Sequence, residues 1–156
     1  MTTFKTLVEY RKPSYKELCK QFDSIFYPCD SVNDLPNFEP IEACKNVSLE
    51  TRELEFELLQ LDLGIEKTPS RPCSCEVPRL LAERGLRPAL YEELVAFAAQ
   101  HAGVLKTFAV IAFGSVRASG RRGDVPRVDA FDSRRLKYSY VCDCDHELYR
   151  FLAVRV

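Results

Sequence analysis

The sequence predicts a single α+β domain with a mostly antiparallel sheet and two or three helices. A chain of 156 residues is the size of one ordinary domain and can bury a core without metals or crosslinks. Helices and strands mix in the first part of the chain and mostly strands follow, an order typical of α+β folds rather than doubly wound ones. Two apolar runs, residues 108–113 and 149–156, frame the last fifty residues and are expected to be buried strands.

The composition is that of a soluble globular protein, with 46% hydrophobic and 29% charged residues. A formal net charge of −1 argues against a general nucleic-acid binder, although the charge is uneven. Residues 116–137 contain seven Arg or Lys against three Asp, whereas residues 39–66 contain eight Asp or Glu against two basic residues. Such runs usually form solvated faces, and they can also orient a charged partner.

No targeting or membrane-spanning pattern is present in this sequence. Its first residues lack the apolar stretch of a secretory signal, and no run approaches the roughly 18 apolar residues that span a bilayer. We therefore expect a cytoplasmic protein without membrane insertion, with surface display by another route as the alternative. Seven cysteines, an odd number, do not fit a secreted disulfide framework.

Short regular elements alternate with irregular ones in the first half of the chain. Residues 6–10 are expected to form a short strand, and Ser14 with Glu17 forms a capping box for a helix that ends near Phe22. Three prolines make residues 23–46 irregular, and the apolar side chains of this stretch should pack against the body. Residues 54–58 alternate apolar and acidic side chains, which predicts a half-buried strand, although Glu and Leu also suit a helix.

Two helices are expected before the final strands. The first covers residues 74–85, with a proline in its first turn and Gly85 as its stop. The second covers residues 90–100, where apolar residues fall at helical spacing. Its apolar face comprises Leu90, Leu94, Phe97 and Ala98. A turn at residues 118–123 leads to a strand at residues 125–128. The core residues expected in the two framing strands are Phe108, Val110, Phe113, Phe151 and Val154.

The strongest metal candidates are Cys142, Cys144 and His146, with Cys73 and Cys75 as the second half of a zinc site. Zinc binds thiolate and imidazole ligands in tetrahedral structural sites. Paired cysteines of such sites are usually separated by two residues, whereas one residue separates them here. The favoured interpretation is that these thiols are unrelated, so we expect neither a metal nor a cofactor.

Little in the sequence indicates an enzyme. His101 and His146 are the two histidines, so a Cys–His or Ser–His pair must use one of them. His101 is expected to cap the end of the second helix, and His146 to be solvated. No Gly-x-Ser-x-Gly, His-Glu-x-x-His or phosphate-loop motif is present. We therefore expect no catalytic activity, with an unidentified enzyme as an alternative.

A basic turn contains Arg117, Arg121, Arg122 and Arg127, which could contact phosphate. The same stretch has no aromatic platform for bases, and the chain as a whole is not basic. A solvated hairpin tip is therefore the favoured interpretation, and no nucleic-acid partner is expected.

The stretch between the framing strands, residues 127–149, is the best candidate for a binding surface. It is rich in Tyr, Ser, Asp, Cys and His, and residues of these types recognise partners without carrying out a reaction. Tyr and Ser in particular supply rigid contact area and adaptable hydrogen bonds. The alternative is an ordinary polar loop.

Three segments of the chain resemble the variable proteins of diversity-generating retroelements. They are residues 87–94, residues 110–115 and the closing run at residues 149–155. The residues that match the family's helix and closing-strand motifs are Arg87, Pro88, Glu92, Glu93, Arg150 and Phe151. These proteins have a C-type-lectin-like fold of the formylglycine-generating-enzyme type. The resemblance covers about residues 50–156, and relatives often carry tryptophans in the variable region, whereas this chain has none.

The resemblance implies a hypervariable, ligand-binding display protein of a bacterium or phage. In that family a mutagenic reverse transcriptase rewrites adenines in the gene, which scatters residues such as Tyr, Ser, Asp and His over the binding face. It implies a lectin-like body at residues 51–156 with a variable face at 127–149, and residues 1–50, which the resemblance does not cover, are expected to form an N-terminal wrap of the same domain. It implies no catalytic residue, and the alternative is a small zinc-stabilised structural protein.

We expect the ligand to be a macromolecule, most simply a protein. Eight side chains are expected to project toward it: Asp129, Phe131, Ser139, Tyr140, Cys142, Asp143, Asp145 and His146.

Overall fold

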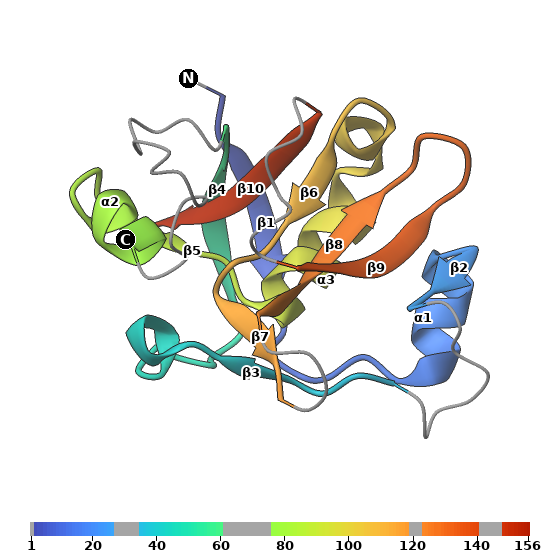
Figure 1. The fold of residues 1–156 in the computed structure, drawn as a ribbon, viewed down its shortest axis with the longest axis horizontal. Coiled ribbons are helices and arrows are strands. Elements are labelled where there is room, and N and C mark those ends of the chain that lie inside the picture. Colours follow the sequence, from blue (N-terminus) through green and yellow to red (C-terminus); the bar gives the residue numbers. More distant parts are fainter. Residues whose placement is uncertain (1, 27–34, 61–75, 119–122, 141–147) are drawn as a thin grey trace.

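The structure, a computed structural model, describes residues 2–26, 35–60, 76–118, 123–140 and 148–156. In this part of the chain three α-helices pack against one large sheet, and two further strands form a small second sheet (Figure 1). The predicted single α+β domain with a mostly antiparallel sheet is confirmed, whereas its C-type-lectin-like form stays a prediction. No helix within these ranges is long and apolar enough to cross a membrane.

Neighbouring strands of the large sheet are antiparallel except where β10 runs beside β6 and β2 beside β9. In spatial order, its strands are β1 (Phe4–Val8), β4 (Arg52–Leu59), β10 (Tyr149–Arg155), β6 (Ala109–Ile111), β8 (Asp124–Asp129), β9 (Arg135–Tyr140) and β2 (Ser24–Ile25). The short pairings outside this order are β5 (Leu86–Pro88) with β10, and β3 (Phe38–Pro40) with β7 (Ser115–Arg117) in the second sheet. The closing strand β10 therefore lies inside the sheet.

Strand β10 buries side chains on both faces of the sheet, as its continuous apolar sequence predicts. Successive side chains of a strand point to opposite faces. Leu152 and Val154 accordingly join one hydrophobic core, whereas Phe151 and Ala153 join a second core on the other face. The sheet thus separates two cores.

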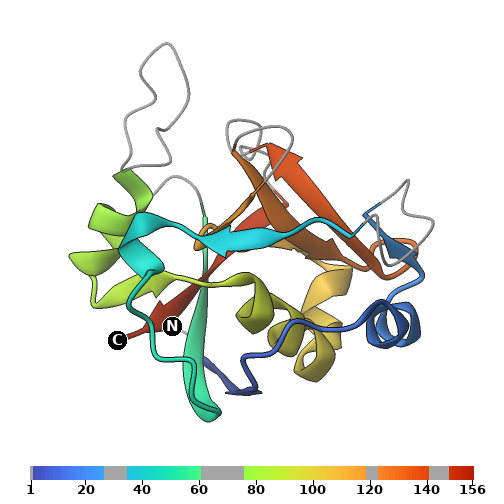
Figure 2. The ribbon, with the colours of Figure 1, turned by 90° about the horizontal axis from the view of Figure 1, so that it is seen from below.

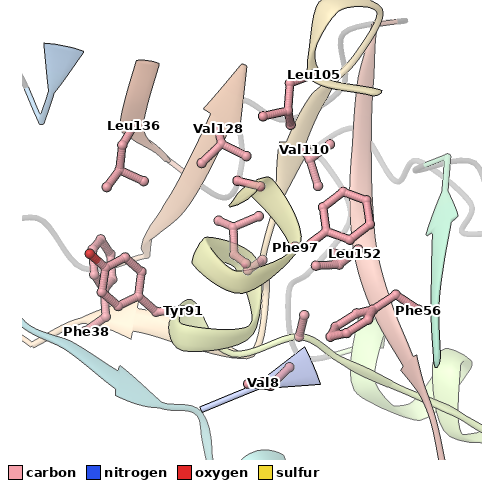
Figure 3. Close-up of a cluster of buried hydrophobic side chains, with 14 of the residues drawn as sticks. Val8, Phe38, Phe56, Tyr91, Phe97, Leu105, Val110, Val128, Leu136 and Leu152 are labelled. Carbon is pink, nitrogen blue, oxygen red and sulfur yellow. The ribbon is translucent and has the colours of Figure 1, made fainter. Parts of the chain in front are cut away.

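The first core lies between the sheet and α3 (Tyr91–Gln100), and Figure 3 shows Phe97 of this helix near Val110 and Leu152 of the sheet. The four residues of the predicted apolar face of α3 are all buried, with at most 1% of each exposed. Helix α1 (Tyr15–Gln21) and the 3₁₀ helix η3 (Ala102–Lys106) complete this layer. Helix α1 begins as predicted, because the Oγ atom of Ser14 accepts a hydrogen bond from the N–H group of Glu17 at 3.2 Å.

The second core is covered by α2 (Glu76–Ala82), which adds the buried side chains of Val77 and Leu81. The rings of Phe113 and Phe151 meet edge to face in this core, with centroids 5.3 Å apart. Figures 1 and 2 both place α2 at one end of the molecule, away from β9. The second face of the sheet is therefore apolar at the α2 end. At the β8–β9 end, the same face carries charged side chains instead.

The N-terminal residues do more than wrap the body, since β1 forms one edge of the large sheet and β2 the other. Phe26, which follows β2, has a φ of 43°, an uncommon value for a bulky side chain. Its buried ring packs against Phe38, Tyr91 and Tyr138, with centroid separations of 5.7, 6.3 and 6.1 Å. This aromatic packing holds Phe26 in a conformation that its own backbone disfavours.

One sequence expectation about burial was wrong. Phe108 is half-buried rather than part of the core, because it precedes β6 and its ring lies 4.2 Å below the guanidinium carbon of Arg150. The stretch between the framing strands also contains a strand that was not predicted, β9, whose Leu136 is fully buried. A single apolar residue between charged neighbours gave too weak a signal for a strand.

Gly114 lies where two segments approach closely, and its replacement is expected to be costly. A Cβ atom on this residue would lie 2.5 Å from the backbone oxygen of Ala89, which already accepts a hydrogen bond from the N–H group of Gly114 at 2.8 Å. The next residue, Ser115, accepts a hydrogen bond at 2.9 Å from the N–H group of Tyr91 at the start of α3. We expect Gly114→Ala to lower the free energy of unfolding by about 3 kcal/mol, because these segments must separate. Urea unfolding followed by circular dichroism measures the loss.

Gly103→Ala is the matched control, because a Cβ atom there meets nothing within 4 Å. We expect this variant to change the free energy of unfolding by less than about 1 kcal/mol, since an added methyl group mainly restricts the unfolded chain. Equal losses in the two variants would contradict the explanation by close approach.

Candidate functional site

A group of charged side chains occupies the β8–β9 end of the sheet's second face. The pairing of β8 with β9 sets Arg127 opposite Lys137 and Asp129 opposite Arg135. These four residues lie on the same face as Val125, which belongs to the second core. Tyr149, at the start of β10, reaches the same face through a hydrogen bond from Arg127. We call these five residues, Arg127, Asp129, Arg135, Lys137 and Tyr149, the Arg127 cluster.

Asp129 is the centre of this cluster, with 2% of the residue exposed. Its Oδ1 atom lies 3.0 Å from Nη2 of Arg135, and its Oδ2 atom lies 3.9 Å from Nε of Arg127. Arg127 donates a hydrogen bond from Nη1 to the hydroxyl oxygen of Tyr149 at 2.7 Å, and its guanidinium carbon lies 5.3 Å from the centre of that ring. These contacts hold the guanidinium of Arg127 in one orientation.

The cluster has a surplus of positive charge. One carboxylate faces three cations, and Arg127 lies directly opposite Lys137, an arrangement that destabilises an antiparallel pair. Burial lowers the pKa of Lys137, and the positive charges of Arg135 and Arg127 lower it further. Within the described residues, Nε of Arg127 is buried without a hydrogen-bond partner, and Lys137 forms no ion pair. A site of this kind favours an anionic group.

The structure buries two of the side chains that were expected to project outward. Asp129 is 2% exposed because it neutralises the two arginines, and Ser139 is 9% exposed because it lies opposite the buried Val125. Phe131 is exposed, at 38%, in the turn between β8 and β9. Tyr140 is the last residue of β9, and its side chain lies outside the described part of the structure. The remaining four positions, Cys142, Asp143, Asp145 and His146, also lie outside it.

Sequence reasoning missed Arg135, Lys137 and Tyr149, and it grouped Arg127 with the wrong partners. Arg117 does not join Arg127, because its guanidinium carbon lies 4.7 Å from the ring centre of Tyr138, on the opposite face of β9. Arg121 and Arg122 lie outside the described residues. The alternation of charged and apolar residues in 127–129 and 135–137 was the available signal, because it predicts a strand face that carries charge.

The candidate metal ligands and the two histidines differ in whether the structure describes them. Among the described residues, no group of three His, Cys, Asp or Glu side chains could hold a metal ion. All five proposed zinc ligands lie outside those residues, so the zinc alternative stays untested. His101 ends α3, and its Nε2 atom lies 3.0 Å from the hydroxyl oxygen of Thr6 and 3.1 Å from the carbonyl oxygen of Lys5. This imidazole therefore ties α3 to β1.

The fold and the cluster together define an α+β domain with a cation-rich site on one face of its sheet. No protein-family model matches the chain, and neither a curated protein nor a solved structure matches it.

Proposed function

We propose that the protein binds a macromolecular ligand, an acidic protein surface, through the Arg127 cluster. The observation that carries this proposal is the surplus of cations around Asp129, with Lys137 set directly opposite Arg127. Like charges set directly opposite each other destabilise a sheet, so this arrangement costs stability when nothing binds. Carboxylates of a partner would relieve the repulsion by pairing with Lys137, which is only partly buried.

Exposed apolar side chains adjoin the cluster in the sequence. Phe131 is 38% exposed in the turn between β8 and β9, and Leu148, next to Tyr149, is 40% exposed. Aromatic side chains often dominate the energy of an interface, whereas charges set its orientation and its rate of formation. The combination favours a protein partner over a small ion.

The resemblance to retroelement-diversified proteins supports a further part of the proposal, namely a hypervariable display protein on a C-type-lectin-like scaffold. Two of its motif residues, Arg87 and Glu93, form a buried ion pair at the start of α3, which gives these positions a physical role. The genomic test is an imperfect repeat of the 3′ coding end beside a reverse-transcriptase gene. Mismatches concentrated at adenines would support diversification by a retroelement. Mismatches without this bias would contradict diversification, but they would not affect the proposal that the Arg127 cluster binds an acidic protein surface.

The binding proposal predicts opposite effects of Lys137→Gln on affinity and on stability. Removing this charge should weaken binding of a fluorescent hexaglutamate peptide about tenfold, a loss of about 1.4 kcal/mol. The same change should raise the free energy of unfolding by about 0.5 kcal/mol, because it removes the repulsion by Arg127. Fluorescence anisotropy measures the affinity, and urea unfolding measures the stability.

Lys106→Gln is the control, because Lys106 belongs to η3 and lies outside the cluster. If both lysine variants weaken binding equally, net charge alone attracts the peptide and the site assignment is wrong. Wild-type protein that does not bind hexaglutamate at low salt contradicts the proposal. Tighter binding of a single-stranded oligonucleotide than of the peptide would overturn the choice of a protein partner.

A further inference from the structure

A cavity of about 560 Å³ lies at the α2 end of the molecule. It lies between α2, strand β5 and the residues that follow the 3₁₀ helix η2 (Glu42–Cys44). Figures 1 and 2 both place α2 at the end of the molecule away from β9, so this cavity is separate from the Arg127 cluster. Its volume falls in the range of roughly 300–1,000 Å³ that is typical of small-molecule sites.

Apolar side chains form most of the cavity wall. Val47 contributes from the chain after η2, Ala82 from α2, and Leu86 and Pro88 from β5. The Arg87–Glu93 ion pair fixes the β5 part of this wall, because Arg87 donates to Oε1 of Glu93 at 2.9 Å and to Oε2 at 2.7 Å. This part of the apolar wall is thus held in place by an ion pair to α3.

The polar side chains that line the cavity are neutral or positive. These residues are Asn46, Ser48, Arg52 and Arg87. No acidic side chain lines the cavity within the described part of the chain. The charge of Arg87 is matched by Glu93, whereas Arg52 forms no ion pair with a described residue. The guanidinium carbon of Arg52 lies 6.0 Å from the ring centre of Tyr10.

We infer that this cavity binds a small amphipathic carboxylate, such as a medium-chain aliphatic acid. Its carboxylate pairs with Arg52 and accepts hydrogen bonds from Asn46 or Ser48, and its apolar body packs against Val47 and Leu86. An acidic headgroup is favoured over a basic one, because two arginines and no described acidic side chain line the cavity.

Titration calorimetry with octanoate tests the inference on the full chain. We expect saturable binding of octanoate, at least about tenfold weaker binding of octanamide, and no binding of acetate, because the site needs both the charge and the apolar body. Octanoate should also raise the melting temperature, since a ligand that binds the folded state stabilises it. Octanamide that binds as tightly as octanoate would remove the anionic specificity and overturn the inference.

Three variants locate the site. Arg52→Gln should weaken the binding of octanoate at least about tenfold and leave the affinity for octanamide unchanged. Ala82→Phe should abolish binding of both compounds by filling the cavity. Arg79→Gln is the charge control, because Arg79 is exposed on α2, pairs with Glu83 and does not line the cavity. Unchanged octanoate affinity in Ala82→Phe, with folding verified by circular dichroism, would place binding elsewhere and overturn the inference, even if Arg52→Gln fails to fold.

Discussion

Phe151→Ala is expected to lower the free energy of unfolding by about 3–5 kcal/mol, because it removes a large side chain from the second core. Phe151 lies in β10, inside the sheet, and is 1% exposed. Its ring packs edge to face against Phe113, and its strand neighbours are Leu59 on β4 and Ile111 on β6. Truncation leaves a cavity that the paired backbone of three strands cannot close. Urea unfolding of the purified variant measures the loss.

Phe131→Ala is the matched control, because it removes the same side chain from an exposed turn. Its effect on stability should stay within about 0.5 kcal/mol. If Phe151→Ala unfolds at the same urea concentration as Phe131→Ala, then β10 is not central to the second core and the assigned fold is wrong.

Glu93→Gln is expected to lower the free energy of unfolding by about 3 kcal/mol. The carboxylate is fully buried and binds both terminal nitrogens of Arg87, whose side chain is 14% exposed. It also accepts hydrogen bonds from the hydroxyl group of Tyr10 at 2.5 Å and from the N–H group of Leu90 at 2.7 Å. A neutral amide leaves the guanidinium buried without a counter-charge and presents it with a donor in place of an acceptor.

Glu92→Gln provides the comparison, because it makes the same chemical change one residue earlier in α3. Burial raises the pKa of Glu92. A carboxyl group whose folded-state pKa exceeds its unfolded value contributes stability at low pH, and this contribution is lost as the pH rises through the folded-state pKa. At neutral pH, Glu92→Gln should therefore cause no loss of stability. Similar unfolding midpoints for the two variants would contradict the role assigned to the Arg87–Glu93 pair.

Much of the secondary structure follows from local patterns in the sequence. The capping box at Ser14 predicted the start of α1, and the 3.6-residue spacing of apolar side chains predicted α3 and its buried face. The alternation at residues 54–58 predicted β4. These signals involve residues within one or two turns of each other, so no knowledge of distant contacts is needed. Strand β9 was missed because local signals do not show which residues distant partners bury, and its Leu136 is buried by such partners.

The candidate binding surface was only partly predictable. Its place in the chain, residues 127–149, followed from residue types, and Phe131 is exposed as expected. The positively charged residues of the Arg127 cluster were not predicted as a group, because Arg127 and Lys137 become neighbours only through the register of β8 with β9. Asp129 was expected to face a ligand, whereas it is buried between two arginines. The sequence alone does not predict which charged residues the register of two paired strands will place opposite each other.

The sequence by itself determined that this chain forms an α+β domain with amphipathic helices and a closing strand that is apolar on both faces. Periodicity and capping are local properties, and they specify which side of each element avoids water. Only the tertiary structure decided that β10 lies inside the sheet and runs parallel to β6. It also decided that Gly114 meets Ala89, and that Arg87 is neutralised by Glu93. Those contacts depend on the order of strands and on close packing between distant segments, which local patterns do not encode.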